Sequence, residues 1–246
     1  MKHYTSSNYN YWRSGMVRID FIGGEKGGVG KSVVARLLAQ YYIDNDVPFI
    51  AMDADNSHGT LLRFYSDYGQ HIELNEFDSA DQIVQQALEQ GKRVLVDLPS
   101  QSKSFLNAWL EENGVLDIAA ECEIPVYFWH VMDDGIDSLN LLDELFAKNY
   151  QPAHYVIVKN LGCGDDFSLF ENSPAKQTAE QRGASILQLN ELHRSTMRKI
   201  DRLNFSYWAA VNNKDTNMGS CLNLMERQRV KVWLRNTYQE FSKVSA

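Results

Sequence analysis

A glycine-rich segment near the N-terminus carries the residues whose chemistry is easiest to infer. It consists of Lys26, Gly27, Gly28, Val29, Gly30, Lys31 and Ser32. Glycines let a backbone curl closely around phosphate oxygens and turn successive N–H groups inward. We expect Lys31 to bridge the β- and γ-phosphates of a nucleoside triphosphate, and the Ser32 hydroxyl to bind Mg²⁺. The segment therefore predicts a phosphate-binding loop.

The loop departs from the strict pattern G-x-x-x-x-G-K-[ST], because Glu25 stands where the first glycine would be. It fits a narrower variant that carries a second lysine, Lys26. Its flanks agree with this reading, since 17–22 reads as a strand and apolar residues recur at helical spacing from Val33 to Tyr41. Strand, loop and helix form the order that a phosphate-binding loop requires. A chance glycine-rich turn beside a lysine is the alternative.

Aspartates follow two further apolar segments. Asp97 ends the predicted strand 93–96, an arrangement in which a carboxylate holds an Mg²⁺-bound water. Asp53 and Asp55 follow the predicted strand 47–52, where one would orient the metal shell and the other the attacking water. The alternatives are a strand-end aspartate that caps a turn, two solvated aspartates, or a ribose contact in a dinucleotide fold. The loop lacks the G-x-G-x-x-G order of that last fold, which favours a triphosphate.

Strand-like and helix-like segments alternate along most of the chain. We expect helices over 78–90, 138–148, 191–203 and 221–243, and further strands over 124–131 and 154–158. Asp78 or Ser79 would cap the first of these helices and Gly91 would stop it. This alternation predicts an α/β, doubly wound, mostly parallel sheet with helices on both faces. Parallel sheets bind ligands at the carboxyl ends of their strands, where the loop, Asp53 and Asp97 all fall.

Length and composition limit the classes of protein to which this chain can belong. The 246 residues are 44% hydrophobic and 23% charged, as in ordinary globular chains. We expect a flexible extension over 1–15 and one domain over 16–246. No membrane span or signal peptide is apparent, and three scattered cysteines favour a reducing cytoplasm over a cysteine-ligated metal. A net charge of −8 argues against a constitutively strong nucleic-acid binder.

Three motifs together resemble the ParA/MinD family of deviant-Walker P-loop ATPases. They are the loop from Lys26 to Ser32, then Asp53-Ala54-Asp55, then Asp97-Leu98-Pro99. The similarity is weaker over 125–142 and 156–160, and weakest in the C-terminal third. The resemblance implies ATP and Mg²⁺ as cofactors, with Ser32, Asp53 and Asp97 around the metal.

The same resemblance implies a homodimer that forms with ATP. In such a dimer Lys26 would reach the partner's phosphates, and a cation supplied in this way accelerates phosphoryl transfer. Asp55 would position the attacking water, and Asn160 would contact adenine unless it is only a turn residue at a strand end.

Some residues depart from the family pattern. Glu25 brings an acid to the loop, and Ser100 and Gln101 replace the commoner Pro-Gly after Pro99. We therefore expect the segment that senses the γ-phosphate to behave differently. The absence of paired cysteines argues against the iron–sulfur carriers of the superfamily.

Two basic stretches lie in the C-terminal third. One holds His193, Arg194, Arg198, Lys199 and Arg202, and the other holds Arg227, Arg229, Lys231 and Arg235. They fit three interpretations: helices that dock on the core with their charges in water, a non-specific DNA-binding face, or, less favoured, a membrane-binding helix.

These observations lead to one main hypothesis: an ATP-hydrolysing, nucleotide-dependent dimer in plasmid or chromosome partition, conjugative mobilisation or cargo positioning. Its turnover would be slow and stimulated by a partner protein. An ATP-dependent ligase or kinase of the dethiobiotin-synthetase type is the alternative, although it would not need Lys26. A third hypothesis, a module that uses nucleotide only as a conformational lock, would not need Asp55.

Overall fold

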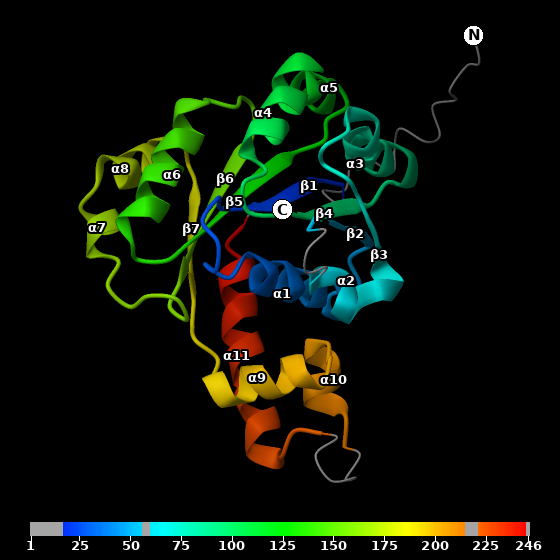
Figure 1. Ribbon diagram of the computed structural model, residues 1–246, viewed down its shortest axis with the longest axis vertical. Helices are drawn as coiled ribbons and strands as arrows, with labels where there is room; N and C mark the ends of the chain where they lie inside the picture. Colours follow the sequence, from blue (N-terminus) through cyan, green and yellow to red (C-terminus); the bar gives the residue numbers. More distant parts are fainter. Residues whose placement is uncertain (1–16, 56–59, 215–220, 245–246) are drawn as a thin grey trace.

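A parallel sheet organises the part of the chain that the computed structural model describes, residues 17–55, 60–214 and 221–244. Its seven strands are ordered β3-β2-β4-β1-β5-β6-β7, and every neighbouring pair is parallel (Figure 1). They are β1 (Ile19–Gly23), β2 (Phe49–Asp53), β3 (Gly69–His71), β4 (Arg93–Asp97), β5 (Val126–Met132), β6 (His154–Asn160) and β7 (Ser185–Leu189). The predicted doubly wound α/β fold is confirmed.

Helices cover the two faces of this sheet and enclose two hydrophobic cores (Figure 1). One face carries α3 (Phe77–Gln90), α4 (Lys103–Glu112), α5 (Val115–Glu121), α6 (Ile136–Ala147), α7 (Ser168–Glu171) and α8 (Pro174–Gln181). The other carries α1 (Lys31–Asp44), α2 (Thr60–Tyr65), α9 (Arg194–Arg202), α10 (Tyr207–Asn212) and α11 (Leu224–Phe241). None of the helices in the described ranges has both the length and the apolarity to cross a bilayer.

The order of the strands places β1 at the centre of the sheet, between β4 and β5. Its last residues pair in register with the ends of both neighbours, Ile22 with Asp97 and Gly23 with His130. The segment that leaves β1 therefore starts beside the carboxyl ends of β4 and β5. This is the position at which an open α/β sheet binds its ligand.

The predicted elements agree with the structure except at some boundaries. Helix α3 begins at Phe77 with Glu76 at its N-cap, whereas we predicted Asp78 or Ser79; the Ser79 hydroxyl instead accepts a hydrogen bond from the backbone N–H of Glu73. Gly91 does end this helix, in a left-handed conformation with φ 62°. The prediction for 1–15 falls outside the described residues. We did not predict β3, β7, α2, α4, α5, α7, α8 or α10 from the sequence, and several of them, such as the six-residue α10, are too short to show a helical period.

A buried network of charged and polar side chains surrounds Asp20 of the central strand, β1. The Asp20 carboxylate accepts hydrogen bonds from Arg18 Nε at 2.9 Å, the Tyr42 hydroxyl at 2.7 Å and Trp129 Nε1 at 2.8 Å. Asp20 is wholly buried and Arg18 is 5% exposed. A buried ion pair tolerates such burial only when its remaining polar atoms are also hydrogen-bonded, as they are here. The network thus joins β1, α1 and β5.

We predict that Asp20→Ala lowers the free energy of unfolding by about 3–5 kcal/mol, because it leaves the Arg18 guanidinium buried without its carboxylate. Urea denaturation followed by circular dichroism measures this loss. The exposed Glu121, in Glu121→Ala, is the control and should change stability by less than about 0.5 kcal/mol. Equal stability of the two variants would contradict a structural role for the network.

Candidate nucleotide-binding site

The predicted phosphate loop runs from the end of β1 to the start of α1. Gly28 and Gly30 both have left-handed backbone conformations, with φ 80° and 96°, that other residues adopt only with strain. A Cβ at Gly30 would also lie 2.3 Å from Asn160 Nδ2. The first helical residue is Lys31, so the free N–H groups of the α1 N-terminus face the loop. These features fit an anion cradle.

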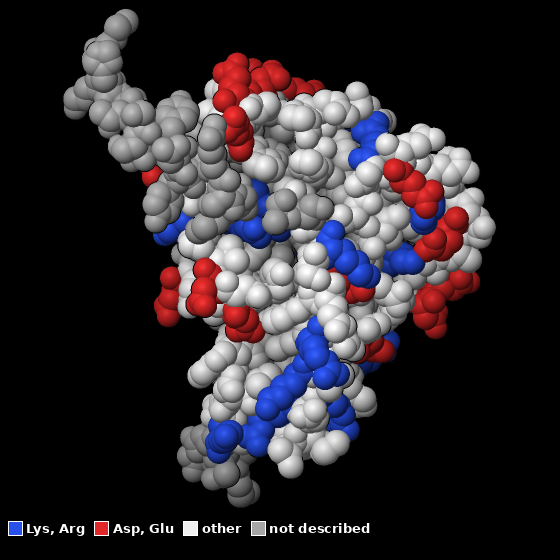
Figure 2. Space-filling view, turned by 180° about the vertical axis from the view of Figure 1, so that it is seen from behind, with Lys and Arg blue, Asp and Glu red and all other residues white. Residues whose placement is uncertain are grey.

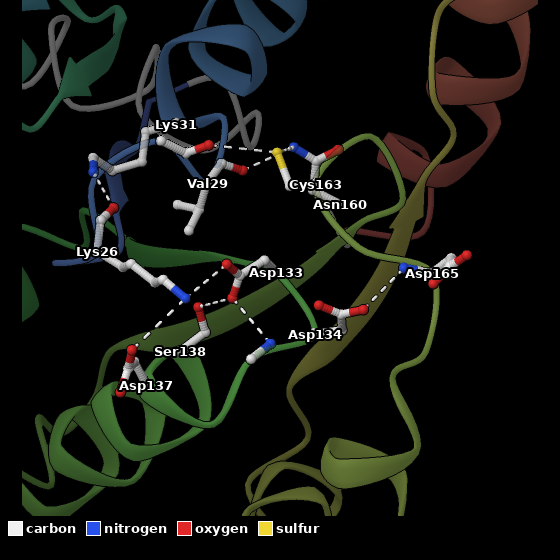
Figure 3. Close-up of polar contacts among 12 residues, drawn as sticks. Lys26, Val29, Lys31, Asp133, Asp134, Asp137, Ser138, Asn160, Cys163 and Asp165 are labelled. Carbon is white, nitrogen blue, oxygen red and sulfur yellow. Dashed lines mark hydrogen bonds and ion pairs between the residues drawn. The ribbon is translucent and has the colours of Figure 1, made fainter.

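Lys31 is held inside the loop. Its ammonium donates to the Lys26 carbonyl oxygen at 2.9 Å (Figure 3). It also donates to Ser100 Oγ at 2.9 Å, and the residue is 8% exposed. Burial lowers the pKa of Lys31, and the carboxylates of Asp97, Glu25 and Asp55 partly offset this. A bound phosphate would offer the ammonium a stronger, charged acceptor than Ser100.

The residues that depart from the family pattern, Glu25 in the loop and Ser100 and Gln101 after Pro99, lie close together. The Glu25 carboxylate lies near the backbone N–H groups of Lys103 and Gln101, which lower its pKa, while burial raises that pKa more. Gln101, in the place of the commoner glycine, still has a left-handed φ of 67°. Ser100 Oγ accepts a hydrogen bond from the Lys31 ammonium. The unusual residues therefore tie the phosphate loop to the segment after β4, and sequence reasoning missed this link although it noted each residue.

Asp97 has the environment expected of a metal ligand. It is 1% exposed, and neither carboxylate oxygen has a hydrogen-bond partner within the described residues. Burial raises its pKa to about 7, while the neighbouring Ser32 hydroxyl lowers it without the geometry of a full hydrogen bond. A buried carboxylate with no partner, next to a hydroxyl, is a donor set that suits Mg²⁺. The two predicted ligands Ser32 and Asp97 thus lie together.

Asp53 differs from Asp97, its partner in the register between β2 and β4. Its Oδ1 accepts from the backbone N–H of Asp55 at 3.0 Å, and its Oδ2 from those of Leu61 and Leu62 at 2.9 and 3.2 Å. The carboxylate therefore anchors the start of α2. Its place in the metal shell stays a prediction, as does the water-positioning role of Asp55, whose charge acts on Lys31.

Lys26 points to the other side of the loop from Lys31 (Figure 3). Its ammonium lies 2.8 Å from Asp133 Oδ2 and 3.9 Å from Asp137 Oδ2, and its side chain is 31% exposed. The hydrogen bond to Asp133 raises the pKa of Lys26. Asp133 is fixed in turn by the Ser138 hydroxyl at 2.6 Å and the Gly135 N–H at 3.1 Å. Sequence reasoning missed Asp133, although it follows β5 as Asp97 ends β4.

Asn160 supports the loop from the end of β6. Its Nδ2 donates to the Val29 carbonyl at 2.8 Å (Figure 3). Its Oδ1 accepts from the Gly162 N–H at 3.0 Å, and the residue is 5% exposed. The sulfur of Cys163 lies beside this amide, 3.3 Å from Nδ2. The predicted adenine contact of Asn160 stays a prediction, because the amide is committed to the loop backbone here.

The contrast between Asp97 and Asp53 predicts opposite effects on stability. In EDTA at pH 8, Asp97→Asn should raise the free energy of unfolding by about 1–3 kcal/mol, because it removes a buried charge without a partner. A carboxyl whose pKa is raised by folding destabilises the protein only above its unfolded pKa. The gain should therefore shrink as the pH falls from 8 to 5.

Asp53→Asn should instead lower stability by about 1–3 kcal/mol, since an amide cannot accept at both atoms. Thermal unfolding in EDTA measures both variants, and titration with Mg²⁺ and ATP should show that Asp97→Asn loses the magnesium dependence of binding. A destabilised Asp97→Asn protein would contradict the assignment of Asp97 as an unpartnered ligand.

A second prediction concerns Asn160. Asn160→Ala should weaken ATP and GTP alike, each by roughly tenfold, because the loss of one hydrogen bond to Val29 loosens the phosphate loop for every nucleotide. Isothermal titration calorimetry with the two nucleotides measures this. A loss confined to ATP would show that Asn160 reads the adenine base.

Comparisons with known proteins bear on the fold of the whole chain. No protein-family model matches the sequence. Protein TraL of Escherichia coli is 24% identical over 245 residues, which cover 92% of this chain and 97% of TraL. Among solved structures, a ParA family ATPase from Chlorobium tepidum superposes with a TM-score of 0.54 at 13% identity, covering 90% of this chain and 98% of that one.

The MinD cell division protein of Aquifex aeolicus superposes with a TM-score of 0.51 at 12% identity, covering 93% and 98% of the two chains. At these identities the superpositions establish the fold, and the three sequence motifs lie where that fold brings strand ends together. The chain has the fold of the ParA and MinD ATPases, and the resemblance inferred from its loop and strand-end aspartates is confirmed.

Proposed function

We propose that this protein binds and hydrolyses ATP with Mg²⁺ and forms a dimer when ATP is bound. The observation that carries this proposal is the different placement of the two loop lysines. Lys31 is buried within the loop, whereas Lys26 extends to the surface and is held there by Asp133. A lysine that served the chain's own phosphates would have no need to lie on the opposite side of the loop.

The chemistry follows from these positions. The loop amides and Lys31 would hold the phosphates, while Ser32 and Asp97 would hold Mg²⁺, which neutralises charge on the β- and γ-phosphates. Lys26 would leave Asp133 and approach the phosphates of a second copy. A cation supplied from a partner stabilises the transition state and is worth roughly 10³–10⁵ in rate in comparable enzymes. Hydrolysis by the isolated monomer would therefore be slow.

We place the protein in partition, conjugative mobilisation or positioning of a cargo, in the cytoplasm and with a protein activator. The charge of its surface supports a role near DNA. Figure 2 shows Lys and Arg side chains gathered over the part of the molecule formed by α9, α10 and α11, and fewer acidic side chains there than elsewhere on this face. Because the chain as a whole carries a net charge of −8, a local excess of positive charge indicates a surface suited to an anionic partner. A membrane surface is the less favoured partner.

We predict that Lys31→Ala abolishes ATP binding, because the phosphates lose the ammonium inside the loop. Lys26→Ala should bind ATP with little change but lose most of its hydrolysis, since its lysine acts on the partner. Calorimetry for binding and phosphate release for hydrolysis separate the two effects. Asp55→Ala should hold ATP without hydrolysing it, and should elute at twice the monomer mass with ATP and Mg²⁺.

Lys92→Ala, a change of an ordinary lysine beyond the loop, is the matched control and should retain binding, dimerisation and turnover. Full and equal ATPase activity in Lys26→Ala and Lys31→Ala would refute the proposal. So would an Asp55→Ala protein that stays monomeric with ATP while the wild type dimerises.

A further inference from the structure

A groove lies at the far end of α1 from the phosphate loop. It is bounded by the last turn of α1, by α10 and by α11, and has a volume of about 560 Å³. Its lining includes Tyr41, Trp208, Tyr238, Lys231 and Arg235. Because α1 spans 14 residues, or about 20 Å at 1.5 Å per residue, this groove is separate from the nucleotide site.

One side of the groove is aromatic. Trp208 is 58% exposed, which is unusual for so large an apolar side chain. Its backbone is nevertheless fixed, because its N–H donates to Gln40 Oε1 of α1 at 2.9 Å. Tyr41 and Tyr238, which line the same groove, pack edge to face with ring centroids 5.1 Å apart. Trp208 thus presents an indole to solvent from a rigid support.

Cationic side chains of α11 also line the groove. Arg227, Lys231 and Arg235 follow one another at intervals of four residues along α11, so they lie on one face with a rise of about 6 Å between them. Lys231 and Arg235 are exposed, and no ion pair joins either to a carboxylate within the described residues. Lys231 and Arg235 are therefore available to an anionic ligand.

One acidic side chain, Asp44, also lines the groove. Its carboxylate is engaged by the protein, since Oδ2 accepts from the Tyr238 hydroxyl at 2.7 Å and Oδ1 from Gln40 Nε2 at 2.9 Å. These bonds hold its two oxygens against Tyr238 of α11 and Gln40 of α1. The charge that the groove offers to a ligand is thus mainly that of Lys231 and Arg235.

We propose that this groove binds a single-stranded nucleic acid, with its phosphates along Lys231 and Arg235 and a base stacked on Trp208. A row of cations beside an exposed aromatic side chain is the arrangement by which proteins hold single strands without reading their sequence. In a duplex the bases are already stacked within the helix, so only the cations would gain from binding. An acidic peptide would meet the same cations but would leave the indole without a flat partner.

Fluorescence anisotropy with labelled oligo(dT) and oligo(U), measured on the full chain without added nucleotide, tests this proposal. We expect both single strands to bind more tightly than a duplex of equal length. Trp208→Ala should weaken the single strands by at least about fivefold and leave the duplex almost unchanged. Trp208→Phe should restore much of the loss, because a smaller ring still stacks.

The charged side of the groove has a matched control on the same helix. Lys231→Ala should weaken binding and reduce the slope of log K against log salt by about 0.7, the value for one phosphate of a single strand. Arg229→Ala removes a neighbouring exposed cation that lines a different groove, and should change binding less. Circular dichroism confirms that each variant is folded.

Several results would overturn the proposal. No measurable binding of single strands, or duplex binding as tight as that of the single strand, would exclude a stacking site. Equal losses in Arg229→Ala and Lys231→Ala would show a diffuse cationic surface, as would competition by poly-glutamate as effective as that by oligo(dT). By contrast, a preference between oligo(dT) and oligo(U) would support the proposal and identify which nucleic acid is the ligand. None of these readouts requires ATP, so they stand apart from the test of the proposed function.

Discussion

The parallel pairing of β1 with both of its neighbours is the constraint on which the candidate site depends. Since all three strands run in the same direction, their carboxyl ends lie at one edge of the sheet. The loop that leaves β1 is therefore flanked by Asp97 at the end of β4 and by Asp133 just beyond β5. An antiparallel neighbour would carry its carboxylate to the opposite edge, where it could contact neither Lys26 nor a metal beside Ser32. The hydrogen bonds to the Asp20 carboxylate hold β1 in place against α1 and β5.

The two lysines of the glycine-rich loop are both stabilised by acceptors within the protein. Each lysine of the loop has an oxygen acceptor: Ser100 and a loop carbonyl for Lys31, and Asp133 for Lys26. These acceptors limit the cost of clustered positive charge in a partly buried place. A bound triphosphate would compete for the Lys31 ammonium, so its binding would release Ser100 and alter the segment between β4 and α4 that lies near Glu25. Under the proposed function, nucleotide binding and the start of α4 would therefore be coupled through Ser100.

Much of this could be predicted from the sequence, because the signals were local. The loop needs glycines at fixed positions, and Gly28 and Gly30 do adopt left-handed conformations. Asp53 and Asp97 follow apolar runs that are the buried strands β2 and β4. The predictions were weaker where a residue's environment comes from elsewhere in the chain. Asp53 and Asp97 look alike in sequence, yet one accepts three backbone hydrogen bonds and the other accepts none within the described residues.

The sequence by itself determined which groups are present and the order of the elements that carry them: a phosphate loop with two lysines, strand-end carboxylates, and a basic C-terminal helix. Only the tertiary structure decided which of those groups meet. It set Lys26 against Asp133 and Glu25 against the start of α4, and it put Trp208 of α10 across a groove from Lys231 of α11. The physical reason is that spacing along the chain specifies local backbone conformation, whereas contacts between distant segments depend on how the helices pack over the two faces of the sheet.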